Sequence, residues 1–249
     1  MVTIFAFRSG RCEQVTSLDR SWLNPASGVV LWVDLESPSI PESLILSDSF
    51  AFHPLAVEDA MSSGQPAKIE AYDGHLFAVL RGPADGEVDF FVGPTCLVTV
   101  HHDASRAVAD FVDNAKHSPR PLVEGPVALF HRIVDALVDG YGPALDALAE
   151  RAREVERQVF DKPSLTIVGA VLSLKRDLFA LWQNTISQRM VVERLARREF
   201  VDISTDMAFR FRDIQDHLVR VVGETEALQN HVSGLLMVSV GVTCSRRWL

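Results

Sequence analysis

The stretch from Lys68 to His102, KIEAYDGHLFAVLRGPADGEVDFFVGPTCLVTVHH, decides the fold. It contains four runs rich in β-branched and aromatic residues: KIEAYD, HLFAVLRG, EVDFFVG and TCLVTVHH. Asp73-Gly74, Asp85-Gly86 and Gly93-Pro94 separate these runs, and Asp-Gly between two such runs is a strong hairpin signal. The stretch therefore predicts four consecutive strands joined by tight turns.

The residues upstream of this stretch add strands and two short helices. Strands are predicted at 2–8, 12–18 and 29–36, the first two forming a hairpin. One helix is predicted after Pro38 and Pro41 and another from Pro54, because proline is tolerated in the first turn of a helix. The first part of the chain is thus predicted to be a mixed sheet with helices packed on it, of the α/β or α+β type.

Downstream of His102 the strand signal ends. One helix is predicted at 104–116, and Pro119 and Pro121 then break the chain. Long helical patterns follow. We therefore expect two domains, a sandwich at 1–121 and a long-helix region at 122–249.

The long-helix region carries three apolar stripes with helical spacing. The first predicts one long helix, which ends at a turn at 161–164, and consists of Val127, Phe130, Val134, Leu137, Tyr141, Leu145, Leu148, Ala152, Val155 and Val159. The second consists of Leu165, Val168, Leu172, Phe179, Trp182 and Ile186. The third has a heptad pattern with one polar position and consists of Ile214, Leu218, Val221, Thr225, Leu228, Val232 and Leu235. We expect long antiparallel helices forming a stalk, whose apolar stripes face either neighbouring helices or another subunit.

Composition excludes some classes of protein. The net charge of −9 argues against nucleic-acid binding, which needs a clustered positive surface. The three cysteines (Cys12, Cys96 and Cys244) form no CxxC pair, so neither a zinc knuckle nor a thioredoxin-like motif is expected. The longest apolar run near the end, from Gly234 to Val242, is much shorter than the roughly 20 residues of a membrane span. Taken alone, the sequence is expected to describe a soluble protein.

Three pairs of acidic residues are candidates for binding a hard cation. They are Glu58 and Asp59, Asp135 and Asp139, and Asp213 and Asp216, the last pair being followed by His217. The i, i+4 spacing places Asp135 and Asp139 on one helix face, where like charges repel unless something compensates. Mg²⁺ takes oxygen ligands and is usually held by one or two carboxylates. The alternative is that each pair is a solvated surface.

Other site patterns are weak. His101 and His102 are adjacent at a strand end, so their side chains point to opposite faces and cannot easily share one metal ion. The sequence contains no GxSxG, Walker loop, HExxH or GxGxxG motif. An enzyme is therefore not expected.

Five segments in the expected order resemble the CorA family of magnesium transporters. They are HPLAVED with the following KIEAYDGHLFAVLRG, then FFVGPTCLVTVHH, RIVDALVDGY, LKRDLFALWQNTISQRMVVERL and FRDIQDHLVRVVGETEALQNHVSGLL. The similarity covers the chain from about Trp32 to Leu236. It implies an N-terminal α/β/α sandwich, long helices ending in a stalk, a homopentamer, and a position on the cytoplasmic side of the membrane.

The resemblance also implies a regulatory divalent-cation site, with Mg²⁺ as the first choice and Co²⁺ or Zn²⁺ as alternatives. Its positions fall on Glu58, Asp59, Asp135 and Asp213, and Asp139 matches a further acidic position. In the family, Asp59 of one subunit would approach Asp213 of the neighbouring subunit, and Mg²⁺ there would favour the closed state. The alternatives are the soluble domain of a ZntB-like zinc transporter, a soluble metal-dependent hydrolase, and an oligomerisation module without a ligand.

The end of the sequence departs from the family pattern. The family continues into a first membrane helix and a YGMNF selectivity motif, whereas MVSVGVTCSRRWL matches poorly and then stops. The resemblance therefore implies a cytoplasmic metal-sensing part without the segment that would cross the membrane.

Overall fold

The computed structural model describes residues 1–83, 85–120, 122–161 and 164–245, with side chains up to residue 241. Its strands are β1 (Val2–Arg8), β2 (Arg11–Val15), β3 (Val30–Glu36), β4 (Lys68–Tyr72), β5 (His75–Arg81), β6 (Glu87–Val92) and β7 (Cys96–His101). Its α-helices are α1 (Ile40–Asp48), α2 (Pro54–Ala60), α3 (Arg106–His117), α4 (Pro126–Asp139), α5 (Tyr141–Asp161), α6 (Leu165–Ala196) and α7 (Thr205–Ser245). Two short 3₁₀ helices, Arg20–Leu23 and Pro25–Ser27, connect β2 to β3.

The seven strands form one mixed sheet in the order β2-β1-β3-β7-β6-β5-β4. The consecutive strands β4 to β7 pair antiparallel, as the hairpin signals predicted. The pair β3 and β7 is parallel, with Leu31 opposite Cys96, and joins this half to the β1–β2 hairpin. The predicted mixed sheet is confirmed.

Helices cover both faces of the sheet. Because successive side chains of a strand point to opposite faces, Phe90 and Phe91 enter different apolar clusters. The cluster around Phe91 contains Leu46 of α1 and Ala56 of α2. The cluster around Phe90 contains buried residues of α3 and α4 and of the ends of α6 and α7 that lie nearest the sheet. The predicted α/β/α sandwich is confirmed, and the two faces carry different helices.

The first predicted long helix is interrupted, so the prediction of one continuous helix was wrong. Gly140 separates α4 from α5, and Pro143, which lacks an N–H group, follows within the first turn of α5. The Tyr141 hydroxyl donates to the Arg81 carbonyl (3.1 Å), and a Cβ at position 140 would stand only 3.1 Å from Cδ of Pro83. The apolar stripe nevertheless continues through the break, with Leu137 and Leu145 both buried.

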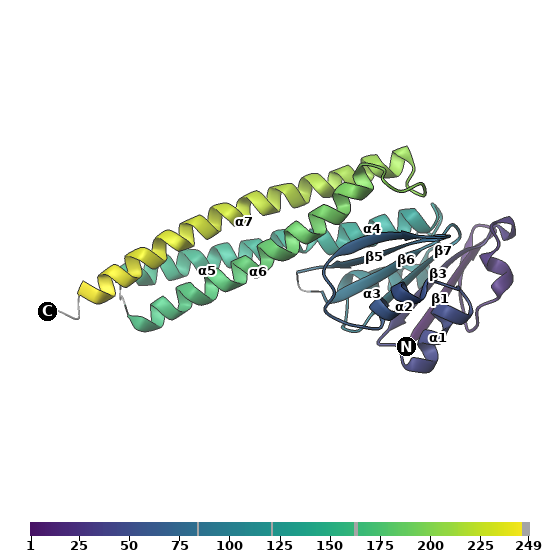
Figure 1. Ribbon diagram of the computed structural model, residues 1–249, viewed down its shortest axis with the longest axis horizontal. Coiled ribbons are helices and arrows are strands. Elements are labelled where there is room, and N and C mark those ends of the chain that lie inside the picture. The colour runs from purple at the N-terminus through teal and green to yellow at the C-terminus, as the bar shows by residue number, and fades with distance from the viewer. Residues whose placement is uncertain (84, 121, 162–163, 246–249) are drawn as a thin grey trace.

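The helices α5, α6 and α7 lie side by side and extend away from the sheet as a stalk (Figure 1). Within the stalk a separate apolar cluster joins Ala152 of α5, Leu174 of α6 and Val232 of α7. All seven residues of the third predicted stripe are buried or half-buried, and the clusters include Ile214, Leu218, Val221, Leu228 and Val232. Neighbouring helices of the same chain therefore provide the partners of these five residues. Thr225, the polar member, is fully buried and donates its hydroxyl to the Val221 carbonyl of its own helix (2.7 Å).

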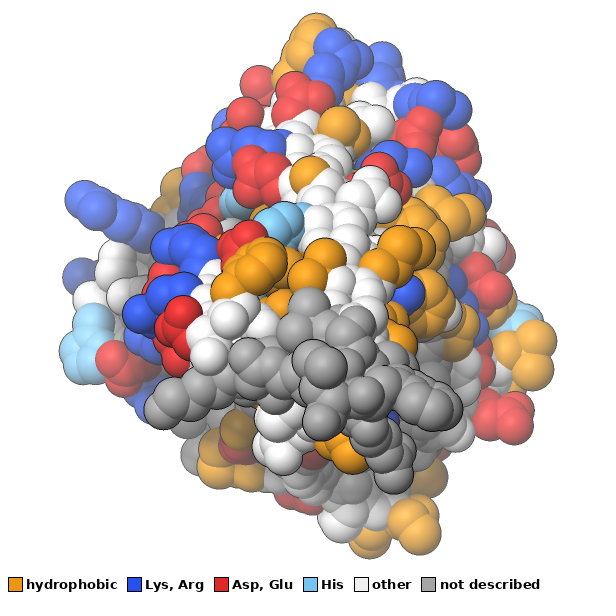
Figure 2. Space-filling view, turned by 90° about the vertical axis from the view of Figure 1, so that its left-hand side faces the viewer, with side chains coloured by type: hydrophobic (Ala, Val, Ile, Leu, Met, Phe, Trp, Pro, Cys, Tyr) orange, Lys and Arg blue, Asp and Glu red, His pale blue; other side chains and the backbone are white. Residues whose placement is uncertain are grey.

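The end of the stalk farthest from the sheet exposes large apolar side chains. Phe160, Leu165 and Met237 are 63%, 73% and 78% exposed. Figure 2 looks onto this end, where hydrophobic side chains gather in front and charged side chains cover the region above them. None of the helices in the described part of the chain is long and apolar enough to cross a membrane. The predicted turn at 161–164 falls partly outside the described residues, and the boundary between domains at 121 and 122 remains a prediction.

Candidate metal centre

The first acidic pair lies on α2. His53 precedes the helix, and its Nδ1 accepts a hydrogen bond from the Leu55 backbone N–H (3.3 Å). The Glu58 side chain is exposed on this helix. The Asp59 carboxylate lies 2.5 Å from Nζ of Lys68 on β4. Asp59 is therefore already paired with a cation within the chain, and Glu58 remains available to solvent.

A second, buried acidic feature lies in the sheet below α2. Asp89 on β6 is 1% exposed, and neither of its carboxylate oxygens has a hydrogen-bond partner in the structure. Burial raises the pKa of Asp89 to about 8, with further contributions from the negative charges of Glu87 and Asp59. Glu87 itself pairs with Arg81 (2.6 Å). The raised pKa favours the neutral form of Asp89 near pH 7. The acid inside the apolar run EVDFFV is a sequence signal for this residue that the predicted acidic pairs did not include.

The second predicted pair lies on α4 and is joined by a residue of α7. Burial raises the pKa of Asp135, and the negative charges of Asp139 and Asp213 raise it further. The structure therefore brings Asp135, Asp139 and Asp213 into electrostatic contact, although no property of the sequence alone placed α7 against α4. His217, one turn after Asp213, places its Nδ1 3.7 Å from the Asp139 carboxylate.

Histidine side chains border the α4–α7 acidic cluster (Asp135, Asp139 and Asp213). His131 packs edge-on against the Phe211 ring (5.0 Å between centroids), and its buried Nε2 has no hydrogen-bond partner in the structure. Burial lowers the pKa of His131, so its imidazole tends to be neutral. The spacings His131–Asp135 and Asp213–His217 are both i, i+4, a signal that the sequence analysis did not use for His131.

The two acidic groups lie on opposite sides of the sheet. The helix α2, which carries Glu58 and Asp59, packs on the face that holds Phe91. The helices α4 and α7 pack on the face that holds Phe90. Among the described residues, no group of three or more His, Cys, Asp or Glu side chains has the arrangement needed to hold a metal ion. One chain thus presents two separate acidic groups, and their joining into a metal site across a subunit boundary remains a prediction.

His101 and His102 have separate environments, as expected. His101 is buried, with its Nε2 3.4 Å from the Asp34 carboxylate and its Nδ1 2.7 Å from the Asp103 carbonyl. Burial acts to lower the pKa of His101, and the Asp34 contact outweighs it, so the net shift is upward. Nε2 of His102 lies 3.0 Å from the Ala60 carbonyl, on the α2 side. The two imidazoles thus contact the carbonyls of different residues, Asp103 and Ala60.

A mixed sheet between helices, continued by a stalk of long helices, defines the fold class of the protein, an α/β/α sandwich with a helical stalk. The model of the CorA-like Mg²⁺ transporter protein family matches residues 27–237, and the chain belongs to this family.

Individual relatives agree with this assignment. The chain is 31% identical over 228 residues to YfjQ of Bacillus subtilis, a candidate metal ion transporter by name, covering 90% of this chain and 69% of YfjQ. It is 26% identical to the cobalt/magnesium transport protein CorA of Thermotoga maritima, covering 78% of this chain and 58% of that protein. The soluble domain of CorA from Methanocaldococcus jannaschii has the same fold, with a TM-score of 0.82 at 15% identity over 96% of this chain and 97% of that domain.

Proposed function

We propose that the chain is the divalent-cation-sensing cytoplasmic part of a CorA-like transporter of Mg²⁺ or Co²⁺. In this proposal, Mg²⁺ binds between adjacent subunits of a homopentamer, at Glu58 and Asp59 of one subunit and at Asp135, Asp139 and Asp213 of its neighbour. Bound Mg²⁺ favours the closed state, and its loss favours opening. The separation of the two acidic groups onto opposite faces of the sheet is the observation that carries the proposal.

The chemistry of the α4–α7 acidic cluster fits a hard cation. Mg²⁺ prefers oxygen ligands and keeps several of its waters, so a few carboxylates suffice. Burial raises the pKa of Asp135 most, and the negative charges of Asp139 and Asp213 raise it further, so these carboxylates repel one another within the chain. Two carboxylates about 4 Å apart repel by roughly 4 kcal/mol at an effective dielectric constant of 20. A divalent ion reverses the sign of that interaction and would draw two subunits together.

The ion would act on the channel by shifting a population. A ligand can shift a conformational equilibrium only by the difference between its affinities for the two states. A site completed by two subunits exists only where those subunits are close together, so Mg²⁺ binds the tight arrangement better. High cytoplasmic Mg²⁺ would therefore favour the tight, closed arrangement.

Protection against proteolysis by Mg²⁺ tests the site residues. We expect Mg²⁺ to slow digestion of the wild-type chain, and Asp59→Asn or Asp213→Asn to remove most of this protection because each takes a negative charge from the site. Asp216→Asn is the matched control, since Asp216 is exposed on the same helix and lies outside the proposed site. Equal protection of the Asp213 and Asp216 variants would show that the site is assigned wrongly.

The position of His217 supports a zinc-type function as a second candidate. Zn²⁺ prefers imidazole and thiolate ligands, and His217 lies 3.7 Å from Asp139. Calorimetry with Mg²⁺, Co²⁺ and Zn²⁺ distinguishes the two functions. A zinc function predicts that His217→Ala weakens Zn²⁺ binding at least tenfold and leaves Mg²⁺ binding unchanged. No observation on the described residues favours the hydrolase alternative.

A further inference from the structure

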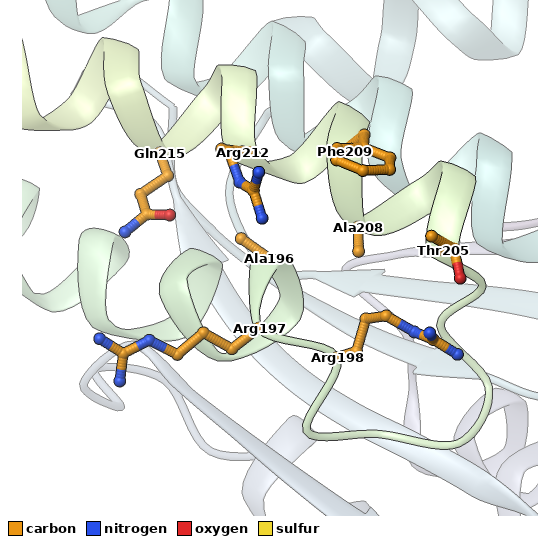
Figure 3. A pocket seen from close by; sticks show the side chains of 8 residues that line it. All are labelled: Ala196, Arg197, Arg198, Thr205, Ala208, Phe209, Arg212 and Gln215. Atoms are coloured by element: carbon orange, nitrogen blue, oxygen red, sulfur yellow. The ribbon is translucent and has the colours of Figure 1, made fainter.

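A basic pocket lies between the end of α6 and the first turns of α7, on surfaces that the proposed metal centre does not use. Its volume is about 340 Å³, and its lining includes Arg197, Arg198 and Arg212 together with Phe209. The lining contains no acidic residue. Figure 3 shows Arg212 projecting from α7 toward the end of α6, with Arg197 and Arg198 extending to either side. Three cationic side chains therefore line one hollow, with the Arg197 and Arg198 guanidinium groups at opposite sides of it.

Two of these three arginines have no acidic partner among the described residues. Arg197 pairs with Glu193 on the preceding turn of α6. Arg198 donates from Nε to the Ile203 carbonyl (3.4 Å), and the Arg212 guanidinium stacks on the Phe209 ring at 5.2 Å. Neither Arg198 nor Arg212 has an ion pair with any residue in the described ranges. Like charges in one pocket repel, and an anion bound between them would remove that repulsion.

The backbone holds one of these arginines in an uncommon conformation. Arg198 has φ +56°, the left-handed region that glycine normally occupies after a helix. The Glu199 N–H donates to the Arg194 carbonyl (3.2 Å) and the Arg198 N–H to the Leu195 carbonyl (3.1 Å), which closes the end of α6. A long cationic side chain thus stands where glycine would be easier to accommodate, and the lining of this pocket includes that side chain.

The geometry points to a binding site for a soluble polyphosphate anion, such as the triphosphate group of a nucleotide. Guanidinium groups bind phosphate oxygens through paired hydrogen bonds, and several separated guanidiniums suit several linked phosphates better than one. The volume of the pocket suits a small organic ligand. The pocket lies at the sheet end of α7, about 50 Å from its C-terminal end at 1.5 Å per residue.

Calorimetry on the full chain without divalent cations tests this inference independently of the metal centre. The probes are inorganic phosphate, tripolyphosphate, ATP, and vesicles of anionic phosphatidylglycerol. We expect tripolyphosphate and ATP to bind at least tenfold more tightly than phosphate, and the vesicles to bind no better than neutral ones. Absence of tripolyphosphate binding at millimolar concentration, or preferential binding to the anionic vesicles, would overturn the inference.

Paired variants test the residues. Arg198→Gln combined with Arg212→Gln is expected to weaken tripolyphosphate binding at least tenfold. Arg220→Gln is the matched control, because Arg220 is exposed on α7 outside the pocket lining, and it should change binding less than twofold. Equal losses in both proteins would mean nonspecific charge attraction and would refute the site. Light scattering without phosphate adds a further test, since self-association that depends on Arg198 and Arg212 would assign the pocket to an acidic surface of a second copy instead.

Discussion

At the scale of single residues, the protonation of Asp89 is linked to folding. Its carboxyl group is buried in the sheet with no hydrogen-bond partner, close to the negative charges of Glu87 and Asp59. The unfolded chain releases this proton near pH 3.8, whereas the folded chain keeps it up to about pH 8. Between these values the folded state binds more protons, so its stability falls as pH rises.

We expect Asp89→Asn to flatten this pH dependence. The amide cannot ionise, so the variant should not lose the few kcal/mol that the wild-type protein loses between about pH 5 and pH 9. Denaturant unfolding of both proteins at pH 5, 7 and 9 measures the difference. His101, whose pKa is also raised, contributes in the same direction in both proteins, so the comparison isolates Asp89. Parallel pH profiles for the two proteins would contradict the assignment.

The sequence identified site residues only where a local pattern existed. The i, i+4 spacing placed Asp135 and Asp139 on one helix face, and the family resemblance selected Asp213 from the pair of Asp213 and Asp216. The contact of Asp213 with α4, and the neighbouring His131, depend on how α7 packs, which no local spacing encodes. The burial of Asp89 likewise follows from the layer of helices above β6.

At the scale of elements, the apolar stripes predicted which helix faces are buried but not where each helix ends. The stripe from Val127 to Val159 reads as one helix, yet α4 ends at Asp139 and α5 begins at Tyr141. The break depends on contacts with the turn after β5, at Arg81 and Pro83. Such long-range contacts are absent from a periodic pattern.

Two leucines on α6 test the stalk packing. Leu174 is fully buried in the stalk cluster, whereas Leu172, only two residues away, is 45% exposed. Leu174→Ala should lower the free energy of unfolding by about 2–5 kcal/mol, because it removes buried methyl groups and leaves a cavity. Leu172→Ala should lower it by about 1 kcal/mol or less. Thermal and urea unfolding measure both values, and similar losses would mean that α6 is rotated relative to the structure described above.

At the scale of the whole molecule, the sheet separates the two acidic groups, so a single copy holds two halves of the proposed metal site. The sequence predicted the sandwich and the stalk, but it could not predict that α2 and α4 lie on opposite faces. A site shared by two subunits can be restored by mixing chains with different defects, whereas a site within one chain cannot.

Mixing two defective chains should restore part of the Mg²⁺ response. Asp59→Asn chains still supply Asp213, and Asp213→Asn chains still supply Asp59, so in an equimolar mixed ring about a quarter of the interfaces are intact. We expect Mg²⁺-dependent association, measured by light scattering, to be weak for each variant alone and partly recovered in the mixture. A double variant, Asp59→Asn with Asp213→Asn in one chain, mixed with itself is the control. No recovery in the mixture would place the site within one chain.

The helix α7 contains 41 residues and no proline. It carries Asp213 near one end, and its other end lies at the tip of the stalk. A helix of this length spans about 60 Å, and it is continuous from Thr205 to Ser245. The part of α7 from Asp213 to its end is about 48 Å long, so as a rigid lever arm it would turn a tilt of about 5° at Asp213 into a displacement of roughly 4 Å at the opposite end. A tilt of α7 too small to disturb its packing beside the sheet would therefore displace its C-terminal end by more than the width of a water molecule.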